Sequence, residues 1–459
     1  MTKSLCVRAV GIAGLWVASA LAVNVAAAGQ PAATAQAVSL NAAPGETHGE
    51  SFAVHAQFTY VEQDTSGFRA PYRGLNSLSP RRGAETTDLT VYLGSALWPG
   101  AELWINPELD QGFGLDNTLG TAGFPSGEAY KVGKNQPYLR LPRLFVRATV
   151  NLGGEREAVE AGANQLGGER NTNRWVFSVG KFGVGDIFDI NQYAHDPRAD
   201  FLNWAAVDAG TFDYAADAWG YTVGAVAERY QGGWTVRGGV FDLSTVPNSA
   251  HLDPGLHEFQ LIFETERRHR WGNNPGKIMF TVFDSRGRMG LLDEATRHGA
   301  ATGAPADVST IRRYRSRLGA DVNLEQQLAA DLGFFVRIGK AAGNVESYEF
   351  TDIDRSIEAG LSLQGTSWNR IHDTAGLAGM VNGISAARQR YLNAGGLGIL
   401  VGDGRLPHPG MEQIIETYYA AELIPHTELT LDYQWINHPA YNLDRGPVSV
   451  FALRFHAQF

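Results

Sequence analysis

The chain has 459 residues and a formal charge of −10 at pH 7, with 48 Asp and Glu against 38 Lys and Arg. This acidic balance argues against a nucleic-acid partner, because phosphate backbones recruit basic surfaces. Charged residues make up only 19% of the chain and glycine is frequent, at 54 residues, which favours a protein with many tight turns and an uncharged exterior. The single cysteine, Cys6, lies near the N-terminus, so the rest of the chain has no cysteine for a disulfide, a metal site or a nucleophile.

The first 28 residues have the pattern of a secretory signal peptide. Lys3 and Arg8 precede an apolar run from 9 to 25, and the alanines at 26–28 fit a signal-peptidase site before Gly29. A membrane anchor is the alternative, but the run is rich in alanine and only weakly hydrophobic. We predict export and cleavage. The mature chain would carry a formal charge of −12, because two of the 38 basic residues and none of the 48 acidic residues lie in the signal.

Residues 29–47 are rich in Ala, Gln and Pro without periodicity, and we predict a flexible lead-in there. From 48 to 459 apolar and polar residues alternate, which indicates strands, because successive strand side chains point to opposite faces. In the segment from Phe52 to Tyr60, for example, His55 and Gln57 lie on the polar face. Similar alternation recurs near 89–93, 175–180, 258–264, 317–325 and 428–435.

The polar faces of these segments combine acids, bases and amides. In a soluble core each such charge would need a partner or cost several kcal/mol, whereas a water-filled lumen solvates it. No later segment approaches twenty apolar residues, so a helical membrane span is not expected. Residues 48–459 are therefore predicted to form an all-β fold, a transmembrane antiparallel β-barrel of about sixteen strands in contact with outer-membrane lipid. A soluble sandwich of half-buried strands is the alternative.

The last segment, 448–459, reads VSVFALRFHAQF and ends on an aromatic residue. Phe451, Leu453 and Phe455 alternate with polar or small residues, as in a strand that is apolar on one face only. A terminal Phe459 suits the signal by which the barrel-assembly machinery recognises bacterial outer-membrane proteins. The sequence therefore predicts the bacterial outer membrane as the location.

The connections between strands also follow a pattern. Short ones near 98–100, 231–233, 325–329 and 424–426 alternate with long ones near 62–86, 110–137, 183–212, 287–311, 383–410 and 437–447. Alternation puts the long loops on one side, which is extracellular in this architecture. The segment 152–173 does not fit, because it is long but falls where a short periplasmic turn is due.

The loop 183–212 mixes charges, amides and aromatics. Asp196-Pro197 predicts a helix start, with an Asp cap and proline in the first turn, and the helix would carry Arg198, Asp200, Asn203 and Trp204. Such a loop suits a segment folded into the lumen, where aromatic faces can stack on sugar rings and polar groups can pair with hydroxyls. An external loop that packs on its neighbours is the alternative.

Two further runs, 106–114 and 123–147, contribute candidates from the wall. Arg143 and Arg147 fall opposite Leu144 and Val146 and should point into the lumen, where arginines facing loop carboxylates would create a transverse field. Plain solvated wall charge is the alternative. The predicted residues of the pore constriction are Asn106, Glu108, Arg143, Arg147, Asp186, Asp189, His195, Arg198, Asp200, Asn203 and Trp204.

Seven strings occur in order from about residue 70 to the end: NSLSP, NPELDQG, GFPSGEAYK, YAHDPRADFLNWA, DYAADAWGY, GLGILVGDG and GPVSVFALRFHAQF. They resemble strings of the carbohydrate-selective porins of the OprB family. The resemblance implies a sixteen-stranded outer-membrane barrel through which monosaccharides such as glucose diffuse passively. Inward-folded loops lined with charged and aromatic residues would narrow it. The resemblance allows a monomer or a homotrimer.

Signals for an enzyme are weak. The chain lacks an HExxH motif, a GxSxG elbow, a Walker loop and a CxxC pair, and its histidines show no i, i+4 metal spacing. We predict no catalysis, no metal and no cofactor. Carboxylate pairs such as Asp186 and Asp189 leave one alternative, an outer-membrane barrel hydrolase acting on lipid or glycan, which would need a nucleophile and a base near the rim. A soluble exported protein that binds or cleaves sugar is a third reading.

Overall fold

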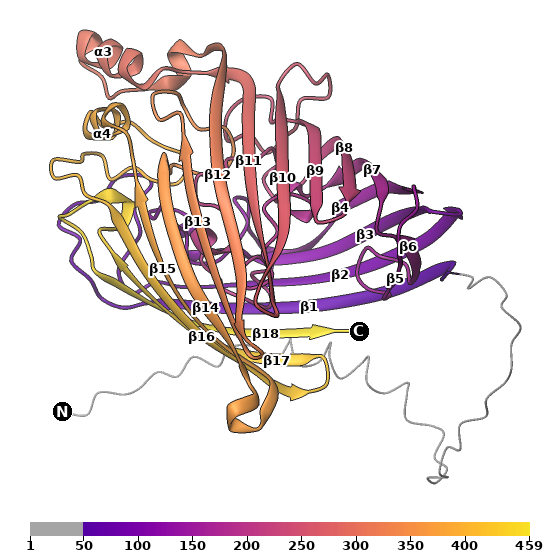
Figure 1. Ribbon diagram of the computed structural model, residues 1–459. Helices are drawn as coiled ribbons and strands as arrows, with labels where there is room; N and C mark the ends of the chain where they lie inside the picture. The colour runs from indigo at the N-terminus through magenta and orange to yellow at the C-terminus, as the bar shows by residue number, and fades with distance from the viewer. Residues whose placement is uncertain (1–48) are drawn as a thin grey trace, which may run out of the picture. The chain divides into compact units, whose positions relative to one another are not determined.

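Residues 49–459, which the computed structural model describes, fold mainly into β-strands (Figure 1). The signal peptide predicted for 1–28 and the lead-in predicted for 29–47 lie outside the described residues. Sixteen strands form one sheet: β1 (Phe52–Thr65), β2 (Gly83–Trp98), β3 (Ala101–Gly112), β4 (Lys134–Asn151), β7 (Arg174–Phe182), β8 (Thr222–Gln231), β9 (Trp234–Asp242), β10 (Phe259–Trp271), β11 (Asn274–Met289), β12 (Arg313–Ala329), β13 (Leu332–Ala341), β14 (Arg355–Gly365), β15 (Arg370–Gly383), β16 (Glu412–Ile424), β17 (Thr427–Asn437) and β18 (Val448–Gln458). The other elements are the strands β5 (Arg156–Val159) and β6 (Gly168–Asn171), the α-helices α2 (Trp204–Val207), α3 (Leu292–Thr302) and α4 (Ala386–Asn393), and the short 3-10 helices η1 (Leu115–Asn117), η2 (Val184–Asp186), η3 (Val308–Ile311), η4 (Thr366–Trp368) and η5 (Pro439–Tyr441).

The sheet is a closed barrel, because its first and last strands pair. β1 and β18 run antiparallel with a register that extends from Gln57 opposite Gln458 to Thr65 opposite Val450. Every other pair in the barrel joins strands that follow one another along the chain, except that β4 pairs with β7 because β5 and β6 lie between them in sequence. The predicted all-β antiparallel barrel of about sixteen strands is therefore confirmed.

The alternation in sequence becomes two different faces of the barrel wall. On β1 the side chains of Phe52 and Val54 are exposed on the outside, where lipid would cover them. The intervening side chains of Gln57, Thr59 and Gln63 point to the interior and are buried there. A one-residue slip would exchange these two sets, so the pattern fixes the register of the strand.

The connections alternate in length around the barrel. The short turns span 99–100, 232–233, 272–273, 330–331, 366–369 and 425–426, and the long loops span 66–82, 113–133, 183–221, 243–258, 290–312, 342–354, 384–411 and 438–447. The predicted alternation is confirmed, although the sequence pattern missed the long loops at 243–258 and 342–354. The long loops mark the extracellular end and the short turns the periplasmic end.

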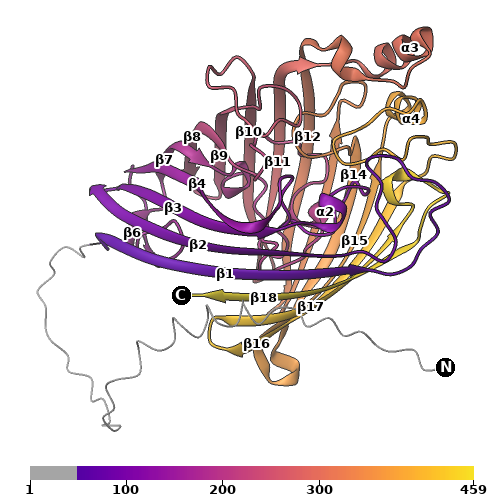
Figure 2. The same cartoon turned by 180° about the vertical axis from the view of Figure 1, so that it is seen from behind.

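The helices are short and belong to the loops. α3 and α4 lie at the end of the barrel that carries the long loops (Figures 1 and 2). α2, labelled in Figure 2, lies within the ring of strands. Within residues 49–459, none of the helices combines the length and the apolar composition needed to cross a membrane.

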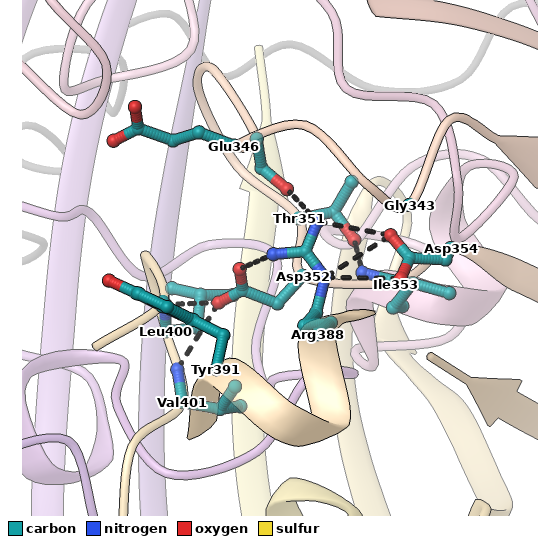
Figure 3. A network of polar contacts seen from close by, with 12 residues as sticks. Gly343, Glu346, Thr351, Asp352, Ile353, Asp354, Arg388, Tyr391, Leu400 and Val401 are labelled. Carbon is teal, nitrogen blue, oxygen red and sulfur yellow. Dashed lines mark hydrogen bonds and ion pairs between the residues drawn. The ribbon is translucent and has the colours of Figure 1, made fainter. Parts of the chain in front are cut away.

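A buried ion network holds two of the long loops together (Figure 3). Arg388 of α4 donates to Asp352 at 3.1 Å and to Asp354 at 3.0 Å, and it is only 2% exposed. Asp352 also accepts the backbone N–H groups of Leu400, at 2.8 Å, and Val401, at 3.3 Å. The network therefore joins the loop before β14 to the loop before β16, and its charges are paired as burial requires.

The segment 152–173 is an independent hairpin. Its strands β5 and β6 form their own two-stranded sheet, and Figure 1 shows them beside the ends of β1, β2 and β3, opposite the helices α3 and α4. The hairpin therefore accounts for the long connection where a short periplasmic turn was expected.

Candidate functional site

A cavity of about 610 Å³ lies inside the barrel. Strands β1 to β4 and β18 line it on one side. The inward-folded loops 113–133 and 183–221 line it on the other. Its volume is in the range of sites that hold small molecules.

Arg143 on β4 forms an ion pair across the edge of this cavity. Its Nε and Nη2 donate to the two carboxylate oxygens of Asp186 at 2.8 and 2.6 Å, a bidentate geometry that fixes the guanidinium plane. The same guanidinium lies 4.8 Å from the ring centre of Tyr221. Burial raises the pKa of the Asp186 carboxyl, but the charge of Arg143 outweighs this effect and holds the pKa below its usual value. Asp186 therefore remains an anion in the lumen.

Arg198, from the loop 183–221, is surrounded by carboxylates. Its Nε lies 3.3 Å from Glu128 and 3.9 Å from Asp88 on the barrel wall, and its Nη1 lies 3.9 Å from Asp196. The Arg198 side chain keeps 17% exposure, so the guanidinium is accessible from the cavity. Burial lowers its pKa, but the surrounding carboxylates, above all Glu128, raise the pKa well above its ordinary value.

His195 supplies a further positive charge. Its Nδ1 lies 3.1 Å from Asp208 and its Nε2 lies 2.9 Å from the carbonyl oxygen of Gly185. Burial lowers the pKa of His195, but its hydrogen bond to Asp208 and the charge of that carboxylate outweigh burial and raise the pKa to about 9. The imidazole is therefore protonated at neutral pH.

Glu108 on β3 completes the charged lining. It accepts hydrogen bonds from Thr90 at 2.8 Å and from Arg140 at 2.6 Å. Arg140 also pairs with Asp110. Five carboxylates line the cavity in all, and they face three Lys and Arg side chains and His195. The site can therefore both donate hydrogen bonds to a polyhydroxylated solute and accept hydrogen bonds from it.

Trp204 lies at the cavity, but both faces of its ring are covered. It stacks on Phe124 with 5.3 Å between ring centres and 7° between planes, and Phe350 lies 5.5 Å away at 32°. The side chain is 4% exposed, so the predicted stacking of a sugar on an open Trp204 face is wrong. Its Nε1 is buried without a hydrogen-bond partner among residues 49–459.

The predicted helix start at Asp196 is also wrong. Asp196 begins only a turn, with its carbonyl accepting the N–H of Asp200 at 2.7 Å, and α2 begins at Trp204 with Asn203 as its N-cap. Glu416 on the barrel wall accepts the N–H groups of Leu202 and Asn203, at 2.5 and 3.1 Å. Because these N–H groups bond to the wall, they are not available to continue a helix from Asp196.

Five predicted constriction residues do not line the cavity. Asp189 pairs with Arg337 of β13 at 3.1 Å, and Asn203 donates to Gln434 of β17 at 2.9 Å, so both anchor the loop to the far wall. Asp200 accepts the backbone N–H groups of His195 and Asp196, each at 3.2 Å. Two others, Asn106 and Arg147, contact Asn164 at the tip of the β5–β6 hairpin, with distances of 2.8 and 2.7 Å.

The other six predicted residues, Glu108, Arg143, Asp186, His195, Arg198 and Trp204, do line the cavity. The lining also contains residues that the sequence did not single out as site residues: Tyr92, Glu128, Lys131, Asn164, Asp196, Asp208 and Tyr221. Tyr92 could have been found from the alternation on its strand, and Glu128 from its place in GFPSGEAYK. Within residues 49–459 there is no group of three or more His, Cys, Asp or Glu arranged to hold a metal ion.

Comparisons with known proteins agree with this geometry. Residues 77–459 match the family described as carbohydrate-selective porin, OprB family. The high-pH structure of Pseudomonas putida OprB aligns with a TM-score of 0.66 at 15% identity, over 89% of this chain and 94% of that chain. The low-pH structure of the same protein gives a TM-score of 0.48 at 11% identity, over 89% and 93% of the two chains. The outer-membrane channel DcaP of Acinetobacter baumannii gives 0.47 at 9% identity, over 90% and 98%.

No curated protein matched the chain by sequence. The family match covers most of the chain, and the fold is that of a solved porin barrel. The hydrolase reading finds no support in either comparison. The chain belongs to the OprB family of carbohydrate-selective porins, and it is an outer-membrane channel for sugars rather than an enzyme.

Proposed function

We propose that this channel passes monosaccharides such as glucose and selects them where Arg143 and Arg198 face the lumen. The observation that carries the proposal is the position of these two arginines on one cavity, each held by carboxylates of the wall or of the inward loops. Paired charges present fixed donors and acceptors at little net field, which suits a neutral solute with many hydroxyls.

Sugar binding at this filter is weak because of the kind of contacts that it offers. Each hydrogen bond to a sugar hydroxyl replaces one to water, so its net contribution is only about 1 kcal/mol. A diffusion channel needs such sites, because a solute must enter readily and also leave readily. The filter therefore binds monosaccharides transiently without trapping them.

Planar-bilayer recordings test the filter. Arg143→Ala and Arg198→Ala should each weaken the block of ion current by glucose, because each removes donors from the cavity and frees its carboxylate partners. Arg390→Ala is the matched control, because Arg390 pairs with Asp293 on the loop helices and does not line the cavity. An unchanged block in both filter variants would contradict a filter at these two arginines.

We also propose that the mature protein begins at Gly29 and assembles in the outer membrane through its C-terminal strand. The alanines before Gly29 and the terminal Phe459 support this proposal. N-terminal sequencing of protein purified from outer membranes tests the cleavage site, and an N-terminus at Met1 would contradict it. Light scattering of the detergent-solubilised protein separates the two assemblies that the family resemblance allows, a monomer and a homotrimer.

A further inference from the structure

The β5–β6 hairpin is longer than barrel closure requires. The Leu152 N–H donates to the carbonyl of Asn173 at 2.9 Å, so the chain ends that flank the hairpin already meet. The other periplasmic turns need only two to four residues. The residues between Leu152 and Asn173 are therefore free to serve a purpose other than connecting β4 to β7.

The tip of the hairpin is built as a rigid turn. Gly162 and Gln165 exchange two backbone hydrogen bonds of 3.0 Å, and Asn164 between them adopts a φ of +57°. Asparagine tolerates this left-handed conformation better than most residues. The Gln165 side chain also donates to the carbonyl of Glu160 at 2.9 Å. These contacts define the turn at the tip.

Three hydrogen bonds fasten this tip to the barrel wall. The Asn106 amide donates to the Asn164 side chain at 2.8 Å, and Arg147 donates to the Asn164 carbonyl at 2.7 Å. The Leu166 N–H donates to Glu102 at 3.1 Å. Asn106 is fully buried, so the contact is an interior one. These bonds hold residues 161–164 against the lumen, where all four line the cavity.

Polar side chains line the same cavity from the periplasmic ends of β1 and β18. His55, Gln57 and Gln458 belong to this group. Gln57 is 7% exposed, and neither its Nε2 nor the Nε2 of His55 has a hydrogen-bond partner among residues 49–459. Buried polar groups that lack a partner in the protein favour a solute or water that supplies one.

We infer that the hairpin tip 161–164 and the polar row His55, Gln57 and Gln458 form a second sugar subsite at the periplasmic exit of the channel. The inference rests on the sugar filter proposed above and adds a site downstream of it. Asn164 is held by its wall contacts, and Gln57 and His55 supply amide and imidazole groups for sugar hydroxyls. A sugar that leaves the arginine filter would exchange its contacts stepwise instead of entering water directly.

The decisive experiment compares glucose block from the two sides of the membrane. In one variant an Asn-Gly turn replaces residues 153–172, and in a second variant, Gln57→Ala, the hairpin is intact. We expect the hairpin variant to conduct more ions than the unmodified channel. In both variants the half-blocking glucose concentration should rise roughly two- to tenfold when glucose is added on the short-turn side. Addition on the long-loop side should change it little.

Glu169→Ala is the matched control, because Glu169 lies on the hairpin, is exposed, and does not line the cavity. Heat-modifiable migration in gels shows that each variant forms a folded barrel. Equal block from the short-turn side in the unmodified channel, the hairpin variant and Gln57→Ala would overturn the subsite and leave the hairpin as a structural cover. A complete absence of glucose block in the unmodified channel would instead overturn the proposed filter itself.

Discussion

Through its ring contacts with Phe124 and Phe350, Trp204 packs the loop 183–221 against the loops 113–133 and 342–354. Trp204→Ala should loosen this packing, because removing a buried Trp side chain costs about 3–5 kcal/mol when the site cannot collapse. We expect a higher single-channel conductance and weaker block by glucose. Planar-bilayer recordings measure both.

Trp368→Ala is the control for this prediction. Trp368 lies on a short turn, contacts Tyr419 and does not line the cavity. A Trp204→Ala channel with the conductance and block of this control would show that the inner loops keep their positions without the indole.

His195 should make ion selectivity depend on pH. Its bond to Asp208 raises its pKa to about 9 against the effect of burial, so the imidazole carries a positive charge at pH 7 and loses it as the pH rises through about 9. The channel should therefore become more selective for cations between pH 8 and pH 10. Reversal potentials in a salt gradient measure this shift, and His195→Gln should lack it.

The alternation of side chains along a strand predicted some site residues and not others. Arg143 and Glu108 lie on strands, where period two decides which face a residue occupies, and both line the cavity. The loop residues Asp189 and Asn203 follow no such rule, and they bind Arg337 and Gln434 on strands distant in sequence. The sequence of one chain does not identify these partners, because no local pattern determines which strands of the barrel a loop will contact.

The terminal strand β18 should be the element most sensitive to truncation. The backbone N–H and C=O of Phe459 both bond to Ala56, at 2.8 and 3.0 Å, while its ring is 75% exposed. Deletion of Phe459 removes these two bonds at the seam of the barrel and also the terminal aromatic. We expect impaired assembly and protein retained in the periplasm, as judged by cell fractionation and heat-modifiable migration.

Phe459→Ala separates the two contributions to assembly. It keeps the backbone bonds and removes only the ring, so an assembly defect as strong as that of the deletion would assign the effect to recognition of the aromatic. Normal amounts of folded protein in the outer membrane for both variants would contradict a role of the terminal residue in assembly.

Elements that follow from the local sequence pattern were predicted correctly, whereas elements that depend on tertiary contacts were not. The strands follow the alternation because each has one lipid-facing and one inward face. The helix expected at Asp196 is absent because Glu416 takes the N–H groups of Leu202 and Asn203. The hairpin at 152–173 was unexplained because its contacts with Asn106 and Arg147 are tertiary.

At the scale of the whole molecule, the charge of the lumen should favour cations modestly. Five carboxylates line the cavity against three Lys and Arg side chains and a protonated His195, which leaves a small negative excess. Reversal potentials at pH 7 should therefore indicate a weak cation preference. Arg198→Ala should strengthen the preference without unfolding the barrel. An anion preference in the unmodified channel would show that Arg143 and Arg198 dominate the field.

The pairing of β1 with β18 determines when this protein can finish folding. Thr59 and His456 meet in the closed barrel although 397 positions separate them, so the strand that is synthesised first must wait for the strand that is synthesised last. The entropic cost of so long a loop grows only with the logarithm of its length, so the difficulty is one of time and not of equilibrium. Until the chain is complete, the backbone edge of β1 from Gln57 to Thr65 lacks its β18 partner, and an unpaired strand edge can recruit other chains. A chain that stopped before β18 would therefore be an open, aggregation-prone sheet and not a smaller pore.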